Sequence, residues 1–384
     1  MIRKLAYLII LLGGFFQVSA QTGTQRQAQS EDLMVDGMRA YMKEDFTEAI
    51  LVFEKLAKVQ TQEPAVFYYL AKSYLAEKQL TSARTNAEKA HLLSPYSFDY
   101  GVLYGDLLLA NKEFKKALDC FEKLLAYDDH RLDGEPDMIR VKQFVFLSKG
   151  DESKDLAEKN AFYLKAAGLG PVQEELWVRI IQLDWELNQK DQVVAHALEA
   201  LENYPHMAAW VYPILGDAYQ ALGNNSASDA AFDKALKANP KDDHVLNNYS
   251  YFLSIRKEKL SLADSLSARL VVDHPKNGTY LDTRAWVLYE LKRYPEARVA
   301  MEAALKDREN VSATLWEHYG DVLFRLKLVD KAVEAWKEAL RLEPARQSVD
   351  KKIQMRQIPE NWAIFEYSYP FLCGVFTVLF SCFC

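Results

Sequence analysis

The sequence predicts an all-α fold, a solenoid of about nine helical hairpins, and three observations carry this prediction. A small residue recurs at intervals of 34 or 35 residues in two series, namely Gly37, Ala71, Gly105 and then Gly216, Ser250, Ala285, Gly320. A second small residue follows each of them twelve or thirteen positions later, and in most units an apolar residue comes four positions after that. Such a fixed period is typical of stacked supersecondary units, none of which can bury its apolar face alone.

The unit at 209–241 illustrates the helical pattern. Its first helix carries apolar or small residues on one face at Tyr212, Leu215, Gly216, Tyr219 and Leu222. After a Gly-Asn-Asn turn, the second helix repeats the face at Ala227, Ala231, Phe232 and Ala235. This i, i+3, i+4 spacing predicts two antiparallel helices that end at Pro240. We expect Gly216 to lie opposite Ser228 where the helices cross, because only small side chains let the backbones approach.

The regular pattern is interrupted in the middle of the chain. One hairpin fits 177–205 with large residues at the usual small positions, and another is expected across 137–170. The surplus residues form a long acidic loop at 128–136. The solenoid is therefore expected to extend over 30–346 and to be irregular at 128–170.

Two further features mark the C-terminal part of the solenoid. The small residues Ser250 and Ala263 are thirteen positions apart, which predicts one extra turn residue near 257–259. After the last hairpin, 347–361 is predicted to be a polar capping helix that directs Val349 and Ile353 inward, as at the end of a solenoid.

The two termini differ in composition from the repeats. Residues 1–20 have the pattern of an export signal peptide, with two basic residues, an apolar run and a Val-Ser-Ala cleavage site. An uncleaved anchor is the alternative, although the apolar run is short for a membrane span. Residues 21–29 are polar and predict a flexible linker.

The C-terminal residues 362–384 form a hydrophobic tail in which Glu366 is the only charged side chain. After Pro370 the apolar run is fourteen residues long, about 21 Å as a helix and shorter than the roughly 30 Å core of a bilayer. Three interpretations stay open: an inserting tail, a span that begins near Trp362, and an atypical end outside the fold.

Composition and motifs favour binding over catalysis. The 384 residues are 49% hydrophobic and carry a net charge of -7. This negative charge argues against binding to the phosphate backbone of a nucleic acid, which needs clustered Lys and Arg. No metalloprotease, hydrolase or phosphate-loop signature is present. The four Cys do not have zinc-site spacing, and the acidic loop lacks the alternating ligand order of a calcium loop. We therefore predict no enzyme activity, no cofactor and no metal site.

The repeated residues resemble a known family. The last hairpin carries the pattern on Trp316, Tyr319, Gly320, Leu323, Ala332, Trp336, Ala339 and Pro344. This set resembles the tetratricopeptide repeat, which implies a right-handed α-solenoid whose first helices line a concave groove for a protein or peptide. The runs 246–251, 279–286 and 315–321 are similar to exported tetratricopeptide proteins of Bacteroidetes-type bacteria.

The resemblance maps a partner-binding groove onto the first helices. Its predicted residues are Asp217, Tyr251, Asp282, Trp286, Tyr289, Glu290, Glu317, Asp321 and Phe324, with Asp106 and Trp185 on the same face. Carboxylates mixed with aromatic rings suit a partner that has basic and apolar groups. The alternative is that these rings pack between helices and the carboxylates only solvate the groove.

The sequence thus predicts a non-enzymatic scaffold for protein–protein interaction in the bacterial envelope, in the periplasm or associated with the outer membrane. A regulatory or docking subunit of an envelope enzyme or secretion complex is the alternative. The partner is expected to be a protein or peptide and not a nucleic acid, and membrane association through the C-terminal tail is left open. The first two units carry Met34, Met38, Tyr68 and Lys72 at groove positions, so the full Lys and Asn pattern of repeats that clamp chaperone C-termini is absent.

Overall fold

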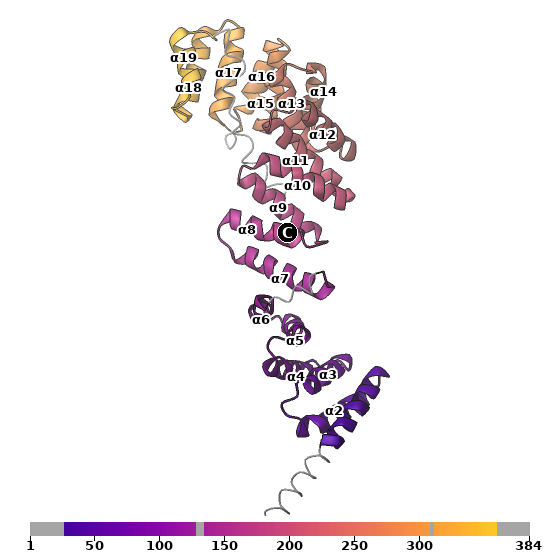
Figure 1. The fold of residues 1–384 in the computed structure, drawn as a ribbon. Helices are drawn as coiled ribbons and strands as arrows, with labels where there is room; N and C mark the ends of the chain where they lie inside the picture. The colour runs from indigo at the N-terminus through magenta and orange to yellow at the C-terminus, as the bar shows by residue number, and fades with distance from the viewer. Residues whose placement is uncertain (1–26, 128–133, 308–310, 359–384) are drawn as a thin grey trace, which may run out of the picture. The chain divides into compact units, whose positions relative to one another are not determined.

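The computed structural model describes residues 27–127, 134–307 and 311–358. Within these ranges every regular element is a helix, and the helices follow one another as nine hairpins and a final single helix (Figure 1). The predicted all-α solenoid of about nine hairpins is confirmed. The predicted signal peptide at 1–20, the predicted tail at 362–384 and most of the predicted acidic loop lie outside the described residues.

The chain divides into two compact units, 1–176 and 177–384. The first unit contains an initial helix at 27–42 and then α2 (Phe46–Val59), α3 (Pro64–Ala76), α4 (Leu80–Leu93), α5 (Phe98–Ala110), α6 (Phe114–Ala126), α7 (Pro136–Glu152) and α8 (Leu156–Ala167). The helices α7 and α8 form the hairpin that the sequence predicts across 137–170. The boundary between the units falls in α9 (Glu174–Glu186).

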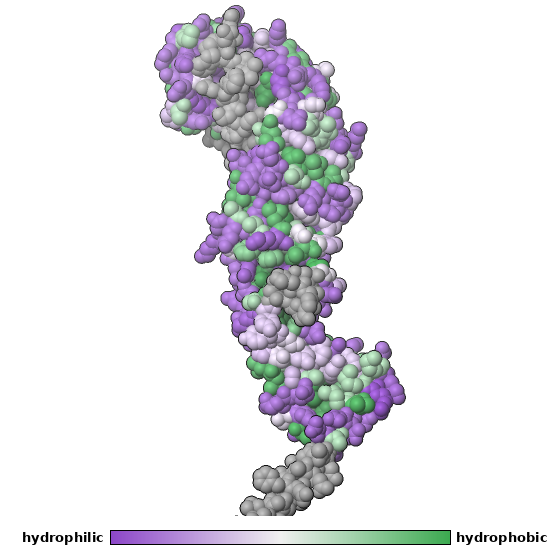
Figure 2. Space-filling view, in the orientation of Figure 1, coloured by the Kyte–Doolittle hydropathy of each residue, from purple (hydrophilic) through white to green (hydrophobic). Residues whose placement is uncertain are grey.

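The second unit continues with four more complete hairpins after the one that α9 begins. Its helices are α10 (Lys190–Asn203), α11 (Ala208–Ala221), α12 (Asn225–Ala238), α13 (Asp243–Arg256), α14 (Leu260–Asp273), α15 (Gly278–Glu290), α16 (Tyr294–Ala304), α17 (Ala313–Arg325), α18 (Val329–Leu342) and α19 (Gln347–Met355), with a 3-10 turn at Pro205–Met207. Figure 2 shows hydrophilic residues over much of the surface on the face that it draws, with apolar residues in small groups between them.

The turn inside eight of the nine described hairpins has the same backbone conformation, and the α7–α8 turn differs. Seven positions after the small residue of the first helix, φ is positive: for example, φ is 62° at Glu44 and 60° at Lys112 and Lys292. A left-handed residue ends the first helix and reverses the chain toward the second. In the α13–α14 turn both Lys257 and Lys259 are left-handed, so the extra residue predicted at 257–259 is present there.

An aromatic ring explains why several first helices need glycine at the crossing. A Cβ added at Gly216 would lie 2.4 Å from the ring of Phe232, and one added at Gly320 would lie 2.3 Å from Trp336. The expected contact of Gly216 with Ser228 is also present, since the Ser228 hydroxyl donates to the Gly216 carbonyl at 2.8 Å. The requirement for glycine therefore comes mainly from the aromatic ring sixteen positions later, and less from the small residue twelve positions later.

The last helix, α19, covers the apolar end of the final hairpin. Val349 is fully buried and packs with Trp336 and Ala339 of α18, and Ile353 packs against the same cluster. Its other side chains are mostly polar, as a capping element requires. No helix among the described residues combines the length and the apolar character needed to cross a membrane.

Candidate functional site

The predicted groove residues occupy a small number of repeat positions. Relative to the small residue of each first helix they lie at -3, +1, +4 or +5, which helical spacing places on one side of the helix. We call this side the first-helix face. Six of the nine residues are buried, namely Asp217, Asp282, Trp286, Tyr289, Glu317 and Asp321, and the other three, Tyr251, Glu290 and Phe324, are partly exposed.

Asp217 on α11 binds two side chains of the next first helix, α13. Its Oδ2 lies 2.5 Å from Nε2 of His244, and its Oδ1 accepts from Asn248 at 3.0 Å. Burial disfavours protonation of His244, but the Asp217 carboxylate and the charge of Asp242 outweigh burial and raise the pKa of His244. The carboxylate is therefore held within the chain by the following repeat.

Asp282 on α15 is paired in the same way with α17. Its Oδ1 lies 2.8 Å from Nδ1 of His318, and both side chains are buried. The His318 ring stacks on Trp286 at 4.1 Å between ring centroids, and Trp286 stacks on Tyr289 at 4.6 Å. The rings of Trp286 and Tyr289 thus belong to one buried stack with His318, and Asp282 is hydrogen-bonded to that histidine. All three predicted partner-binding residues are engaged within the chain.

Glu317 and Asp321 on α17 share a buried lysine from α19. The ammonium of Lys352 donates to Glu317 at 2.8 Å and to the two oxygens of Asp321 at 2.9 and 2.8 Å. Arg346 donates to the other oxygen of Glu317 at 2.8 Å, and the Trp336 indole donates to Asp321 at 2.9 Å. Burial opposes the charge on Lys352, but the two carboxylates outweigh burial and raise the pKa of Lys352.

The three partly exposed members of the predicted set make looser contacts within the chain than the buried acids described above. Glu290 lies 3.4 Å from the ammonium of Lys257, and partial burial raises the pKa of Glu290 despite that lysine. Phe324 lies beside Trp336 with ring centroids 5.9 Å apart. Tyr251 packs at the edge of the apolar clusters of α13 to α16. These three residues stay accessible to a partner.

The first unit carries the same face with different side chains. Asp106 on α5 forms a bidentate pair with Arg140 on α7, at 2.6 and 3.0 Å, with both side chains about 40% exposed. The repeat before it has Lys72 at the equivalent +1 position. The Lys72 ammonium lies 5.6 Å from the ring centre of Tyr41 and 5.3 Å from that of Tyr68.

Tyr41 and Tyr68 flank Lys72, and a third tyrosine, Tyr100, packs against Tyr68 from the next first helix. Tyr68 on α3 lies 4.9 Å from Tyr100 on α5 between ring centroids, and Tyr41 belongs to the helix at 27–42. We call Tyr41, Tyr68, Lys72 and Tyr100 the tyrosine–lysine patch, all of whose members are partly exposed. The predicted site set does not contain this patch. The change from Asp to Lys at a +1 position is the sequence signal that points to it.

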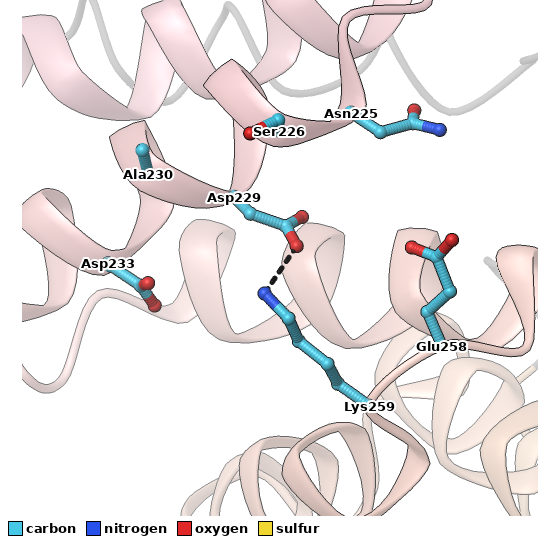
Figure 3. Close-up of a pocket in the computed structure, with 7 residues that line it drawn as sticks. All are labelled: Asn225, Ser226, Asp229, Ala230, Asp233, Glu258 and Lys259. Carbon is cyan, nitrogen blue, oxygen red and sulfur yellow. Dashed lines mark hydrogen bonds and ion pairs between the residues drawn. The ribbon is translucent and has the colours of Figure 1, made fainter.

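A separate cavity lies beside the α13–α14 turn (Figure 3). It has a volume of about 460 Å³ and is lined by Asn225, Ser226, Asp229, Ala230, Asp233, Glu258 and Lys259. Asp229 is neutralised from within the chain, by Arg256 at 2.5 Å and Lys259 at 2.7 Å. The described residues hold no cluster of His, Cys, Asp or Glu arranged to bind a metal ion.

Family models match three segments of the chain. A model for subunit 3 of the anaphase-promoting complex, or cyclosome, matches 42–124, and tetratricopeptide repeat models match 211–242 and 283–347. No curated protein is significantly similar in sequence.

Several solved structures resemble the chain in fold. A tetratricopeptide repeat protein from Parabacteroides merdae is 14% identical with a TM-score of 0.39, and the match covers 76% of this chain and 98% of that one. Yeast Tom70 is 13% identical with a TM-score of 0.35, covering 86% and 88%. YrrB, described as having an unusual peptide-binding site, is 17% identical with a TM-score of 0.35, covering 50% and 95%.

Proposed function

Because this chain is a solenoid of tetratricopeptide repeats, a kind of protein that generally mediates protein–protein interaction, we propose that it is a non-enzymatic scaffold of the bacterial envelope. It binds another protein or peptide along the first-helix face. The observation that carries this proposal is the face itself, where polar and aromatic side chains recur at fixed repeat positions on successive helices. The face offers partly exposed rings at Tyr251 and Phe324 in the second unit, and the tyrosine–lysine patch in the first.

Crosslinking in cells tests this use of the face. A photo-reactive residue at Tyr251 or Phe324 should yield a crosslink to one recurrent protein. Val272 and Val299 are 76% and 68% exposed on the second helices α14 and α16, and they serve as controls that should yield none. Equal capture from both sets, or capture from neither, would contradict partner binding on the first-helix face.

The sequence of residues 1–20 supports export of the protein to the periplasm or outer membrane. Cleavage after Ala20 would leave Gln21 as the first residue of the mature chain. N-terminal sequencing of protein from fractionated cells tests this: Gln21 in the envelope fraction is expected, and an intact Met1 in the cytoplasm would contradict export. Association with a membrane through the tail at 362–384 is a further proposal. It is tested by comparing how much of the protein carbonate and detergent each extract from the membrane fraction.

The alternative proposal is a regulatory or docking subunit of an envelope enzyme or secretion complex. The same aromatic and acidic positions support it equally, because docking of a catalytic partner uses the same kind of surface. The identity of the crosslinked protein separates the two. A recurrent enzyme favours the regulatory subunit, and a component of an assembly machine favours the scaffold.

A further inference from the structure

The +1 position of the first helices is charged in some repeats and uncharged in others, as at Met38, Tyr251 and Trp286. Asp106, Asp217 and Asp321 occupy it in three repeats. Each of them binds a polar or cationic side chain of the next first helix: Arg140, His244 with Asn248, and Lys352 respectively. The negative charge of these three acids is therefore balanced by a side chain of the helix that follows their hairpin.

Lys72 carries the opposite charge at the same position, and the following repeat does not supply a carboxylate for it. The equivalent residue of that repeat, Asp106, is held by Arg140. Across the described residues, no carboxylate lies within ion-pair distance of Lys72. Burial lowers the pKa of Lys72, but the Tyr41 and Tyr68 side chains outweigh burial and raise it, so the side chain is charged at neutral pH.

The tyrosines add apolar surface and hydrogen-bond donors around this charge. Burial raises the pKa of both Tyr68 and Tyr100, which keeps their hydroxyls protonated at neutral pH. Tyr69 completes the ring cluster, 5.4 Å from Tyr41 and 5.3 Å from Tyr68 between ring centroids. A carboxylate has no protons to donate and accepts from both an ammonium and a phenol.

We propose that the tyrosine–lysine patch binds an extended segment of a partner protein in which a carboxylate lies next to an aromatic or aliphatic side chain. The carboxylate pairs with Lys72, and the apolar side chain packs on Tyr68 and Tyr100. This inference rests on the proposed function, since it names the chemistry of the partner of the first-helix face. Charge complementarity selects the occupant, because Lys72 is a partly exposed cation with no carboxylate of the described residues within ion-pair distance.

A pair of matched peptides tests the proposal on the full mature chain. The probe is an acetylated and amidated Ser-Leu-Phe-Glu-Phe-Leu-Ser peptide, and its control has Gln in place of Glu. Fluorescence anisotropy should show the Glu peptide binding about tenfold more tightly, which is the low end of what a hydrogen bond to a charged group contributes. Equal affinity of the two peptides would overturn the proposal.

Substitutions at Lys72 locate the binding. Lys72→Gln should remove the difference in affinity between the two peptides. Lys72→Glu should reverse the charge preference, so that a third peptide with Lys in place of Glu binds more tightly than the Glu peptide. Lys89 is the matched control, because its ammonium also lies over a ring, 3.9 Å from the centre of Phe67, but on the second helix α4. Lys89→Gln should leave the discrimination unchanged. Equal loss in both variants, with unchanged melting temperatures, would overturn the assignment to the patch.

The outcome is separable from that of the proposed function. If crosslinks from Tyr251 and Phe324 persist but Lys72→Gln leaves peptide discrimination intact, the inference fails and the partner-binding face stands. If those crosslinks are absent while the patch still selects the Glu peptide, the second-unit face fails and the patch stands.

Discussion

The ammonium of Lys352 lies 2.8 Å from Oδ2 of Asp321, and both side chains are buried where α19 covers the final hairpin. The same ammonium binds Glu317, so one cation from the capping helix holds two acids of α17. Replacement of one member of such a buried network leaves an uncompensated charge, which is more costly than the net contribution of the pair itself.

Lys352→Met should therefore destabilise the second unit by about 3–5 kcal/mol. Urea unfolding followed by circular dichroism measures this loss. Lys337 on α18 is exposed and provides the matched control, for which Lys337→Met should change stability by less than about 0.5 kcal/mol. Similar values for the two variants would contradict the role assigned to Lys352.

Asp106 occupies the same repeat position as Asp321 but is 41% exposed at its side chain. Asp106→Asn is expected to cost at most about 1 kcal/mol, because solvent screens an exposed pair with Arg140. The cost should fall further in 1 M salt, where the Debye length is about 3 Å. A salt-independent loss as large as that of Lys352→Met would show that Asp106 is not screened.

Stability of the second unit should depend on pH through His244. Its pKa in the folded state is raised by Asp217 and Asp242, although burial opposes this, and Asn248 also contacts the ring. A raised folded pKa contributes stability that is complete below the unfolded value of about 6.5 and is lost as pH rises through the folded value. Unfolding measurements between pH 6 and pH 9 should show this loss in the native chain.

His244→Gln should remove that pH-dependent component. The control is His274→Gln, because His274 pairs with Asp243 at 2.7 Å while its side chain is 40% exposed. Because solvent screens an exposed pair, that substitution should change stability by less than about 1 kcal/mol at either pH. A native chain that is equally stable at pH 6 and pH 9 would refute the contribution of His244.

Gly216 should not tolerate a methyl group, because the ring of Phe232 fills the space above it. Gly216→Ala is expected to cost about 1–3 kcal/mol through overpacking, less the gain in helix propensity of up to about 1 kcal/mol. The double variant with Phe232→Leu should show a smaller loss than the sum of the two single changes, since the smaller side chain leaves room. Thermal unfolding of the three variants measures the coupling.

Gly168 is the matched control for this prediction. An added Cβ there would meet only two backbone oxygens, at 3.4 and 3.9 Å, and the residue has helical φ and ψ. Gly168→Ala should therefore be neutral or stabilise the chain by up to about 1 kcal/mol. Destabilisation at Gly168 equal to that at Gly216 would mean that crowding by the ring is not the cause.

The repeat architecture could be predicted because its causes are local in the sequence. The spacing of small residues located the helix crossings, and the thirteen-residue interval from Ser250 to Ala263 located the longer turn at Lys257 and Lys259. The apolar periodicity also located α7 and α8 in the irregular stretch. In each case the residues that decide the geometry lie within one hairpin, so their spacing alone carries the information.

Which residues of the candidate site are buried and paired depended on contacts between hairpins, so the sequence could not predict it. Asp217, Asp282 and Asp321 look alike in the sequence as acids on the first-helix face, and so does Asp106. Only the tertiary structure decided that the first three are buried with partners 27 to 36 residues away. It also decided that Lys72 lies against Tyr41 and Tyr68 and, among the described residues, pairs with no carboxylate. The sequence by itself determined the fold and the face, because helical period and side-chain size act within a repeat. The tertiary structure decided which charges on that face remain available, because a charge is neutralised by whichever side chain the neighbouring repeat brings against it.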